Sequence, residues 1–207
     1  FLARERVRYV GEPVAAVAAE EESIAEAAIN LIEVQYEELP AVFDPVLAAQ
    51  PGAPLLHEQL EAYEHIGAVR PIPHSNVISS SEEKFGDVAQ GFAESDHVWE
   101  DTFRMPTVQH GQIDPHCAVA QWAVDGKIIL WTPNDGPHRL RKELADALGF
   151  PLTRIQVNVP YLGGGFGGKG GLKAEAVAIA LAMKVSPRPV KVIMTREEVF
   201  TATLVRH

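Results

Sequence analysis

The sequence predicts an α+β chain, in which a small α+β domain is followed by part of a larger α+β domain. Strand-like and helix-like runs alternate along most of the 207 residues. Asp125-Gly126 lies between two alternating apolar runs, which is a strong hairpin signal. We expect a partial first domain over residues 1–58, a connection over 59–84 and an incomplete second domain over 85–207.

The first domain is predicted to contain strands flanking a helix. RVRYV (6–10) and PVAAVAA (13–19) are separated by Gly11 and have the composition of short paired strands. Ser23 and Glu26 form a capping-box pattern that would open a helix of roughly three turns. VQYEEL (34–39) is a further strand-like run before Pro40.

The second domain is predicted to alternate between strands and helices. A short helical pattern leading into a strand is expected over 86–105, and a hairpin over 117–133. An amphipathic helix follows over 137–150 and ends at Gly149, the residue type that most often closes a helix. The remaining elements are a strand at 154–160, a buried helix at 172–184 and a strand at 188–194.

Composition excludes several classes of protein. A formal net charge of −10 argues against nucleic acid or an anionic membrane as the main partner. The single cysteine, Cys117, excludes an intrachain disulfide and a thiolate iron–sulphur site. No apolar run approaches the length of a membrane span, and we expect a cytoplasmic protein. The abrupt start at Phe1 suggests a fragment.

The stretch VPYLGGGFGGKGG (159–171) is a candidate ligand site, because clustered glycines allow close approach to the backbone or positive φ. Gly163, Gly165 and Gly168 fit a dinucleotide-binding pattern between a strand and a helix, but the acidic residue expected about 20 positions later is missing. A nucleotide-phosphate loop would need Ser or Thr after Lys169, where Gly170 stands.

The block VQHGQIDPHCA (108–118) gathers polar side chains upstream of this loop. His110, Asp114 and His116 suggest metal ligands, but residues six apart on a strand do not easily reach one small ion. Cys117 is expected to be an ordinary small buried residue, because no cationic neighbour favours a thiolate.

Over essentially its whole length, the chain resembles the molybdenum-cofactor-binding subunit of the xanthine dehydrogenase and aldehyde oxidase family. VRYVGEPVAAVAAEE is similar to that family's hammerhead α+β domain, here partial. The ordered blocks GDVAQGFAESDHVWEDTF, TVQHGQIDPHCAVAQW, WTPNDGPHRLRKELADALGFP and VNVPYLGGGFGGKGG resemble the first molybdopterin-binding domain.

The resemblance implies a molybdenum hydroxylase, which inserts a water-derived oxygen at a C–H of an aldehyde or N-heteroaromatic small molecule. It implies a molybdenum–pterin cofactor, as molybdopterin or its cytosine dinucleotide form. Iron–sulphur clusters and FAD would lie on partner subunits or domains, and the remainder of the molybdenum subunit would complete the site. The alternatives are a nicotinamide dehydrogenase domain using the Gly163–Gly168 loop and a noncatalytic scaffold.

The resemblance also assigns residues. The cofactor-binding positions are Gly164, Gly165, Phe166, Gly167 and Gln109, and the Phe166 backbone would lie near the molybdenum. The family's glutamine aligns with Val108, and this departure leaves open the role of Gln109 beside it. No catalytic residue is expected in this chain, because the family's base lies farther toward the carboxyl end.

Three of these positions have a structural alternative. Phe166 would be either a wall of the substrate channel or a core aromatic folded over the loop. Asp114 is expected to support the loop through hydrogen bonds. Lys169 would be either a solvated charge or a partner of carbonyls or a carboxylate near the loop.

Overall fold

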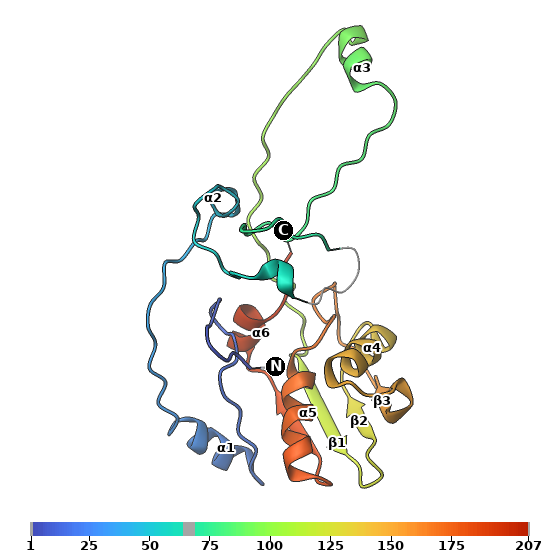
Figure 1. Ribbon diagram of the computed structural model, residues 1–207. Coiled ribbons are helices and arrows are strands. Elements are labelled where there is room, and N and C mark those ends of the chain that lie inside the picture. The colour runs from blue at the N-terminus through green and yellow to red at the C-terminus, as the bar shows by residue number, and fades with distance from the viewer. Residues whose placement is uncertain (1, 64–68, 207) are drawn as a thin grey trace. The chain divides into compact units, whose positions relative to one another are not determined.

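The computed structural model describes residues 2–63 and 69–206, which divide into two compact units. One unit runs from Val34 to Phe103; the other combines the residues up to Glu33 with those from Arg104 onward. The described chain contains helices and one four-stranded sheet, which confirms the predicted α+β class (Figure 1).

The unit formed by the residues up to Glu33 and from Arg104 onward, called the larger unit below, contains a four-stranded sheet of order β3-β2-β1-β4. The strands are β1 (Cys117–Trp122), β2 (Ile128–Trp131), β3 (Ile155–Asn158) and β4 (Val190–Ile193). β1 pairs antiparallel with β2 and with β4, whereas β2 and β3 are parallel. The β1–β2 pair is the hairpin that Asp125-Gly126 predicts, with Gly126 at φ 78°.

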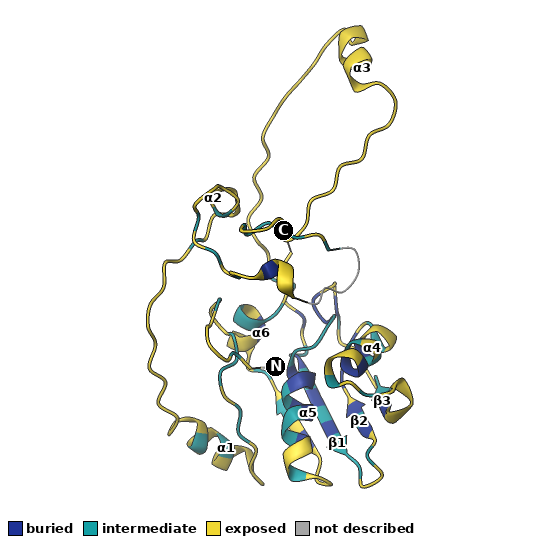
Figure 2. Cartoon of the chain, viewed as in Figure 1, coloured by how far each residue is buried: buried dark blue, intermediate teal, exposed yellow. Residues whose placement is uncertain are grey.

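Helices α4 (Pro137–Leu148) and α5 (Ala174–Val185) cover one face of this sheet. That face presents Ala120 and Leu130, paired across β1 and β2 and both fully buried. Leu144 of α4 and Ile179 of α5 join the same apolar cluster. Figure 2 shows buried segments on β1, β2, α4 and α5. The β3–α5 connection contains the glycine-rich stretch, which therefore starts beyond the end of β3.

The remaining helices are short. In the larger unit these are α1 (Glu22–Ile29), the 3-10 turn η2 (Leu152–Arg154) and α6 (Arg196–Ala202). The unit from Val34 to Phe103 contains α2 (Pro45–Ala48), the 3-10 turn η1 (Leu60–Ala62) and α3 (Val88–Glu94). The side chain of Asn76 connects this unit internally, since it accepts from Leu56 N at 2.9 Å and donates to the carbonyl oxygens of Ala48 and Pro54.

The strands expected at 6–10, 13–19 and 34–39 are wrong, as is the strand after the 86–94 helical pattern. The turn at Gly11 is present, with φ 94° and a hydrogen bond from Glu12 N to Tyr9 O of 3.2 Å. An extended segment becomes a strand only when another segment pairs with it, and within the described residues these segments have no such partner. Residue composition alone does not reveal that partner.

The helix predicted after Ser23 forms, but it spans eight residues and begins at Glu22, with no side-chain cap. The predicted elements from the hairpin to the last strand are all confirmed within a few residues. Gly149 ends α4 in the left-handed conformation, as predicted. Helix α6 was not predicted, although Thr195 and Glu198 form the capping box that indicates its start.

Candidate functional site: the glycine loop

The glycine loop, residues 163–171, is built around a tight turn at its tip. The amide of Gly168 donates to the carbonyl of Gly165 at 2.8 Å, and the intervening Phe166 and Gly167 have φ values of 53° and 87°. Positive φ at both central positions is the signature of a type I′ turn. Glycine meets this requirement without strain, whereas Phe166 adopts it at a cost of about 1 kcal/mol or more.

The bare backbone of the loop is occupied largely by the protein's own side chains. A Cβ added at Gly163 would lie 2.5 Å from Asp114 Oδ1, and one at Gly165 would lie 2.9 Å from Asp135 Oδ2. At Gly168 an added Cβ would overlap the amide of Gln112. Gly163, Gly165 and Gly168 are therefore needed for close packing inside the chain, whereas an added Cβ at Gly167 would have no atom nearer than 3.8 Å.

Lys169 is buried, with 2% of its surface exposed, so the expectation of a solvated charge is wrong. Its Nζ forms an ion pair with Asp114 Oδ2. The alternative expectation, that Lys169 is the partner of a carboxylate near the loop, is confirmed. Partial burial raises the pKa of Asp114, but the hydrogen bond and charge of Lys169, with nearby backbone amides, outweigh this effect and hold the pKa below its usual range.

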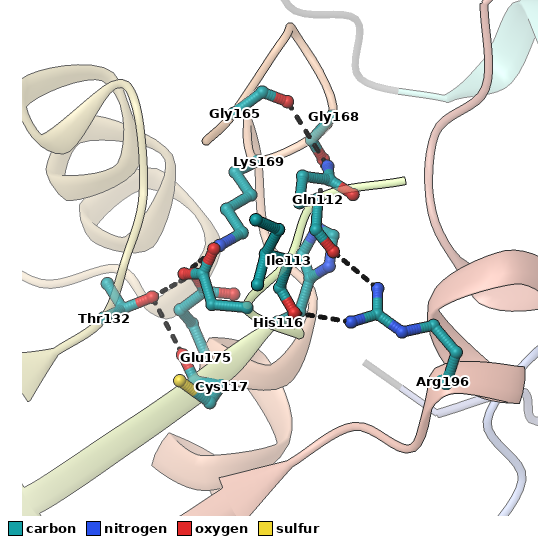
Figure 3. Close-up of polar contacts among 11 residues, drawn as sticks. Gln112, Ile113, His116, Cys117, Thr132, Gly165, Gly168, Lys169, Glu175 and Arg196 are labelled. Atoms are coloured by element: carbon teal, nitrogen blue, oxygen red, sulfur yellow. Dashed lines mark hydrogen bonds and ion pairs between the residues drawn. The ribbon is translucent and has the colours of Figure 1, made fainter. Parts of the chain in front are cut away.

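Gln112 and His116 also contact the loop, on either side of Asp114 in the sequence (Figure 3). Gln112 Nε2 donates to the carbonyl of Gly165 at 3.3 Å, and His116 Nε2 lies 3.0 Å from the carbonyl of Gly168. Since a carbonyl only accepts, His116 carries its proton on Nε2. Burial lowers the pKa of His116, which keeps the imidazole neutral. Sequence reasoning missed these contacts, although the alternate spacing of residues 112, 114 and 116 was visible.

Gln109 does not point into the loop in this structure. Its Nε2 donates to the carbonyl of Val199 at 2.8 Å and to Thr203 Oγ1 at 3.2 Å, and its Oε1 accepts from the amide of His110. Gln109 therefore holds helix α6. The same helix provides Arg196, whose Nη1 and Nη2 each donate at 2.7 Å, to the carbonyls of Gln112 and Ile113.

The tip of the loop offers hydrogen-bond donors. Within the described residues, the backbone amides of residues 164–167 have no protein acceptor. Phe166 is 66% exposed and does not lie in the core, so the core-aromatic alternative does not describe it. Neighbouring amides without acceptors at a glycine-rich turn suit an oxygen-rich, anionic group. These residues therefore fit the phosphate- and oxo-bearing cofactor that the resemblance implies.

Two other chemistries find less support. In the part of the chain that the structure describes, no group of His, Cys, Asp or Glu has the geometry of a metal site. A dinucleotide fold would place a pyrophosphate at the start of the helix after the loop. Here the start of α5 is occupied by the chain's own carboxylate: Glu175 is 4% exposed and accepts a hydrogen bond from the amide of Lys173 at 2.9 Å.

Cys117 is half-buried, and burial raises the pKa of its thiol.

None of the helices in residues 2–63 and 69–206 is long and apolar enough to span a bilayer.

The family models match most of the chain. A molybdopterin cofactor-binding domain matches residues 70–207, and the a/b hammerhead domain of aldehyde oxidase and xanthine dehydrogenase matches residues 1–40. The boundaries expected at residues 58 and 84 stay a prediction.

Curated relatives and solved structures agree with these matches. A probable xanthine dehydrogenase subunit of Bacillus subtilis is 36% identical over all of this chain, which spans 26% of that relative. A Cu,Mo-CO dehydrogenase structure covers 99% of the chain with a TM-score of 0.80 and 29% identity, over 26% of its own length. The aldehyde oxidoreductase of Desulfovibrio gigas has the same TM-score at 27% identity, and the chain covers 21% of it. The chain therefore belongs to the molybdopterin cofactor-binding family of xanthine dehydrogenase-type oxidoreductases, and spans about a quarter of the relatives just described.

Proposed function

We propose that this chain forms the glycine-loop side of a molybdenum–pterin site in a hydroxylase. The observation that carries the proposal is the row of backbone amides at residues 164–167, which have no protein acceptor in the described chain. They lie at an exposed turn, within a chain that belongs to a cofactor-binding family. The cofactor, when bound, supplies the chemistry for adding a water-derived oxygen to a C–H bond.

The residues of the chain would bind and orient. The amides of Gly164, Gly165, Phe166 and Gly167 would donate to oxygen atoms of the cofactor, and the Phe166 backbone would lie nearest the metal. The Phe166 ring, 66% exposed, would limit the space beside the reacting carbon. Gln109 would act on the cofactor from a greater distance than the loop does, because its side chain donates a hydrogen bond to the carbonyl of Val199 in α6. We assign no catalytic base to this chain.

The substrate class is an aldehyde or N-heteroaromatic small molecule, and electrons would leave through iron–sulphur clusters to FAD on partner subunits or domains. The remainder of the molybdenum subunit would complete the site. We place this assembly in the cytoplasm. These assignments extend to the chain what its relatives' names and family imply.

A pair of glycine substitutions tests the loop in the full-length protein assembled with its partners. Gly167→Ala puts a side chain at φ 87°, where the nearest atom, His110 Nε2, would be 3.8 Å from the new Cβ. Gly149→Ala is the matched control, since it imposes the same left-handed strain at φ 65° in open space at the end of α4.

Both variants should lose a similar amount of stability, about 1 kcal/mol. Only Gly167→Ala should lower the molybdenum and pterin content per protein. Equal cofactor content in the two variants would overturn the assignment of the tip. A wild-type protein that folds and binds NADH, with neither molybdenum nor pterin, would point instead to the nicotinamide alternative.

A further inference from the structure

Three side chains at alternate positions before β1 converge on the glycine loop. Gln112 donates to the carbonyl of Gly165 and His116 to the carbonyl of Gly168, while Asp114 pairs with Lys169. Gln112 is 1% exposed and His116 is 5% exposed, whereas Ile113, between them and outside the set, is 90% exposed. The loop is thus held from one short segment at three successive points.

Gln112 and His116 contact the carbonyls of Gly165 and Gly168, and the Gly165 carbonyl also accepts the turn hydrogen bond from the Gly168 amide. The 165–166 and 168–169 peptide bonds are trans, since the only cis bond of the described chain is Ser186-Pro187. In a trans peptide the carbonyl of one residue and the amide of the next point in opposite directions. Drawing the Gly165 carbonyl inward, to Gln112, therefore turns the amide of Phe166 outward.

Packing alone does not account for this arrangement. Gln112 Oε1 and His116 Nδ1 are buried without a hydrogen-bond partner in the described residues, which costs stability. An apolar pair of similar size would fill the same space without that cost. The feature that the polar pair adds is the direction of the loop's peptide units.

We propose that Gln112 and His116 are positioning residues, which hold the glycine loop in its amide-out conformation before any cofactor binds. The Lys169–Asp114 ion pair holds the loop at the residue after Gly168. This inference rests on the proposed function for its purpose, but the conformation of the cofactor-free loop is a property of this chain alone.

The test compares two isosteric substitutions in the full-length protein assembled with its partners. Gln112→Glu replaces the donor to the Gly165 carbonyl by an acceptor. Gln121→Glu is the control, because Gln121 Nε2 donates in the same way to the carbonyl of Pro187, at 3.0 Å, on a part of β1 away from the loop. Hydrogen exchange of the cofactor-free protein, followed by mass spectrometry, reports the turn of the loop through the amide of Gly168, which donates to the Gly165 carbonyl.

Gln112→Glu should speed exchange at the Gly168 amide by at least about fivefold and lower the molybdenum and pterin content in proportion, because one oriented hydrogen bond to the Gly165 carbonyl is lost. Gln121→Glu should change neither. Unchanged exchange in Gln112→Glu would overturn the inference, whatever the cofactor content. If the wild type contains no molybdenum–pterin, the proposed function fails, and the exchange comparison still decides this inference.

A second pair keeps the test decisive if Gln112→Glu does not fold. His116→Gln retains an Nε2 donor within reach of the Gly168 carbonyl, whereas His116→Leu removes it. If His116→Gln keeps slow exchange and full cofactor content, while His116→Leu exchanges faster and contains less cofactor, the positioning role of His116 is supported. Equal losses in the two variants would show that only the packing of the imidazole matters, and would overturn the inference for His116.

Discussion

Lys169 Nζ and Asp114 Oδ2 form an ion pair beneath the glycine loop, with side-chain exposures of 1% and 33%. The lysine is the more deeply buried partner of the pair. The ion pair connects the glycine loop to the segment before β1, because Lys169 belongs to the loop and Asp114 to that segment.

Lys169→Ala should destabilise the protein strongly, because it leaves Asp114 without its partner and empties a buried volume. We expect a loss of about 2–4 kcal/mol in the free energy of unfolding, measured with urea. The control is Lys142→Ala, whose pair with Asp146 is exposed and should contribute little to stability. Similar losses in the two variants would contradict the buried pair.

The neutral state of His116 predicts a pH dependence. Burial lowers its pKa below the ordinary value of 6.5, and the hydrogen bond to the Gly168 carbonyl does not overcome this effect. The unfolded chain therefore binds a proton at a higher pH than the folded chain does, and stability falls as the pH drops below 6.5 toward the folded pKa.

The comparison is between wild type and His116→Gln, which does not titrate, in unfolding experiments at about pH 7.5 and about pH 5.5, on either side of the ordinary histidine pKa. The wild type should lose more stability than the variant over this interval. If the two proteins lose the same amount, carboxylates elsewhere account for the whole dependence, and His116 is not buried as described.

Phe166 should matter for substrate choice more than for stability. Because the ring is 66% exposed, Phe166→Ala should cost less than about 1 kcal/mol, far below the loss for a core aromatic. Its removal should change the kcat/KM ratio of bulky to small substrates by more than it changes cofactor content. Phe166→Gly should be at least as stable as Phe166→Ala, since φ is 53°. A fall in stability alone would contradict the channel role.

Arg196 should anchor the segment that holds the loop. Arg196→Lys keeps the charge but loses the two-pronged contact with the carbonyls of Gln112 and Ile113, so we expect a loss of about 1–2 kcal/mol. Arg188→Lys is the control, because Arg188 pairs with Glu20 at an exposed position and should lose little. Equal losses of stability in Arg196→Lys and Arg188→Lys would show that the two hydrogen bonds of the Arg196 guanidinium do not stabilise the protein.

The hairpin, α4, β3, α5 and β4 could be predicted because their signals are local. Asp125-Gly126 fixes a turn and Gly149 ends a helix, each within a few residues of what it controls. The strand-like runs at 6–10 and 34–39 lack that property, since a strand depends on a partner that its own residues do not specify. Pairing with a distant segment, not composition, decides whether they become strands.

The site also has a part that local sequence predicts and a part that depends on distant segments. The loop itself could be located from its glycines, but Gly163, Gly165 and Gly168 make room for the side chains of Asp114, Asp135 and Gln112 and not for a ligand. A sequence gives no sign of which side chain will fill the space above a glycine. Lys169 was equally ambiguous, because a lysine is solvated or buried according to whether a carboxylate from another segment reaches it.

The contacts that shape the loop join residues far apart along the chain. Gln112 and Gly165 are separated by 53 positions, His116 and Gly168 by 52, and Arg196 and Gln112 by 84. Contacts of such long sequence separation close large loops and form late in folding. The glycine loop therefore cannot assemble as a local unit during synthesis. We expect it to acquire its shape only after residue 196 has been made and α6 has docked, which places cofactor insertion after the folding of this sheet.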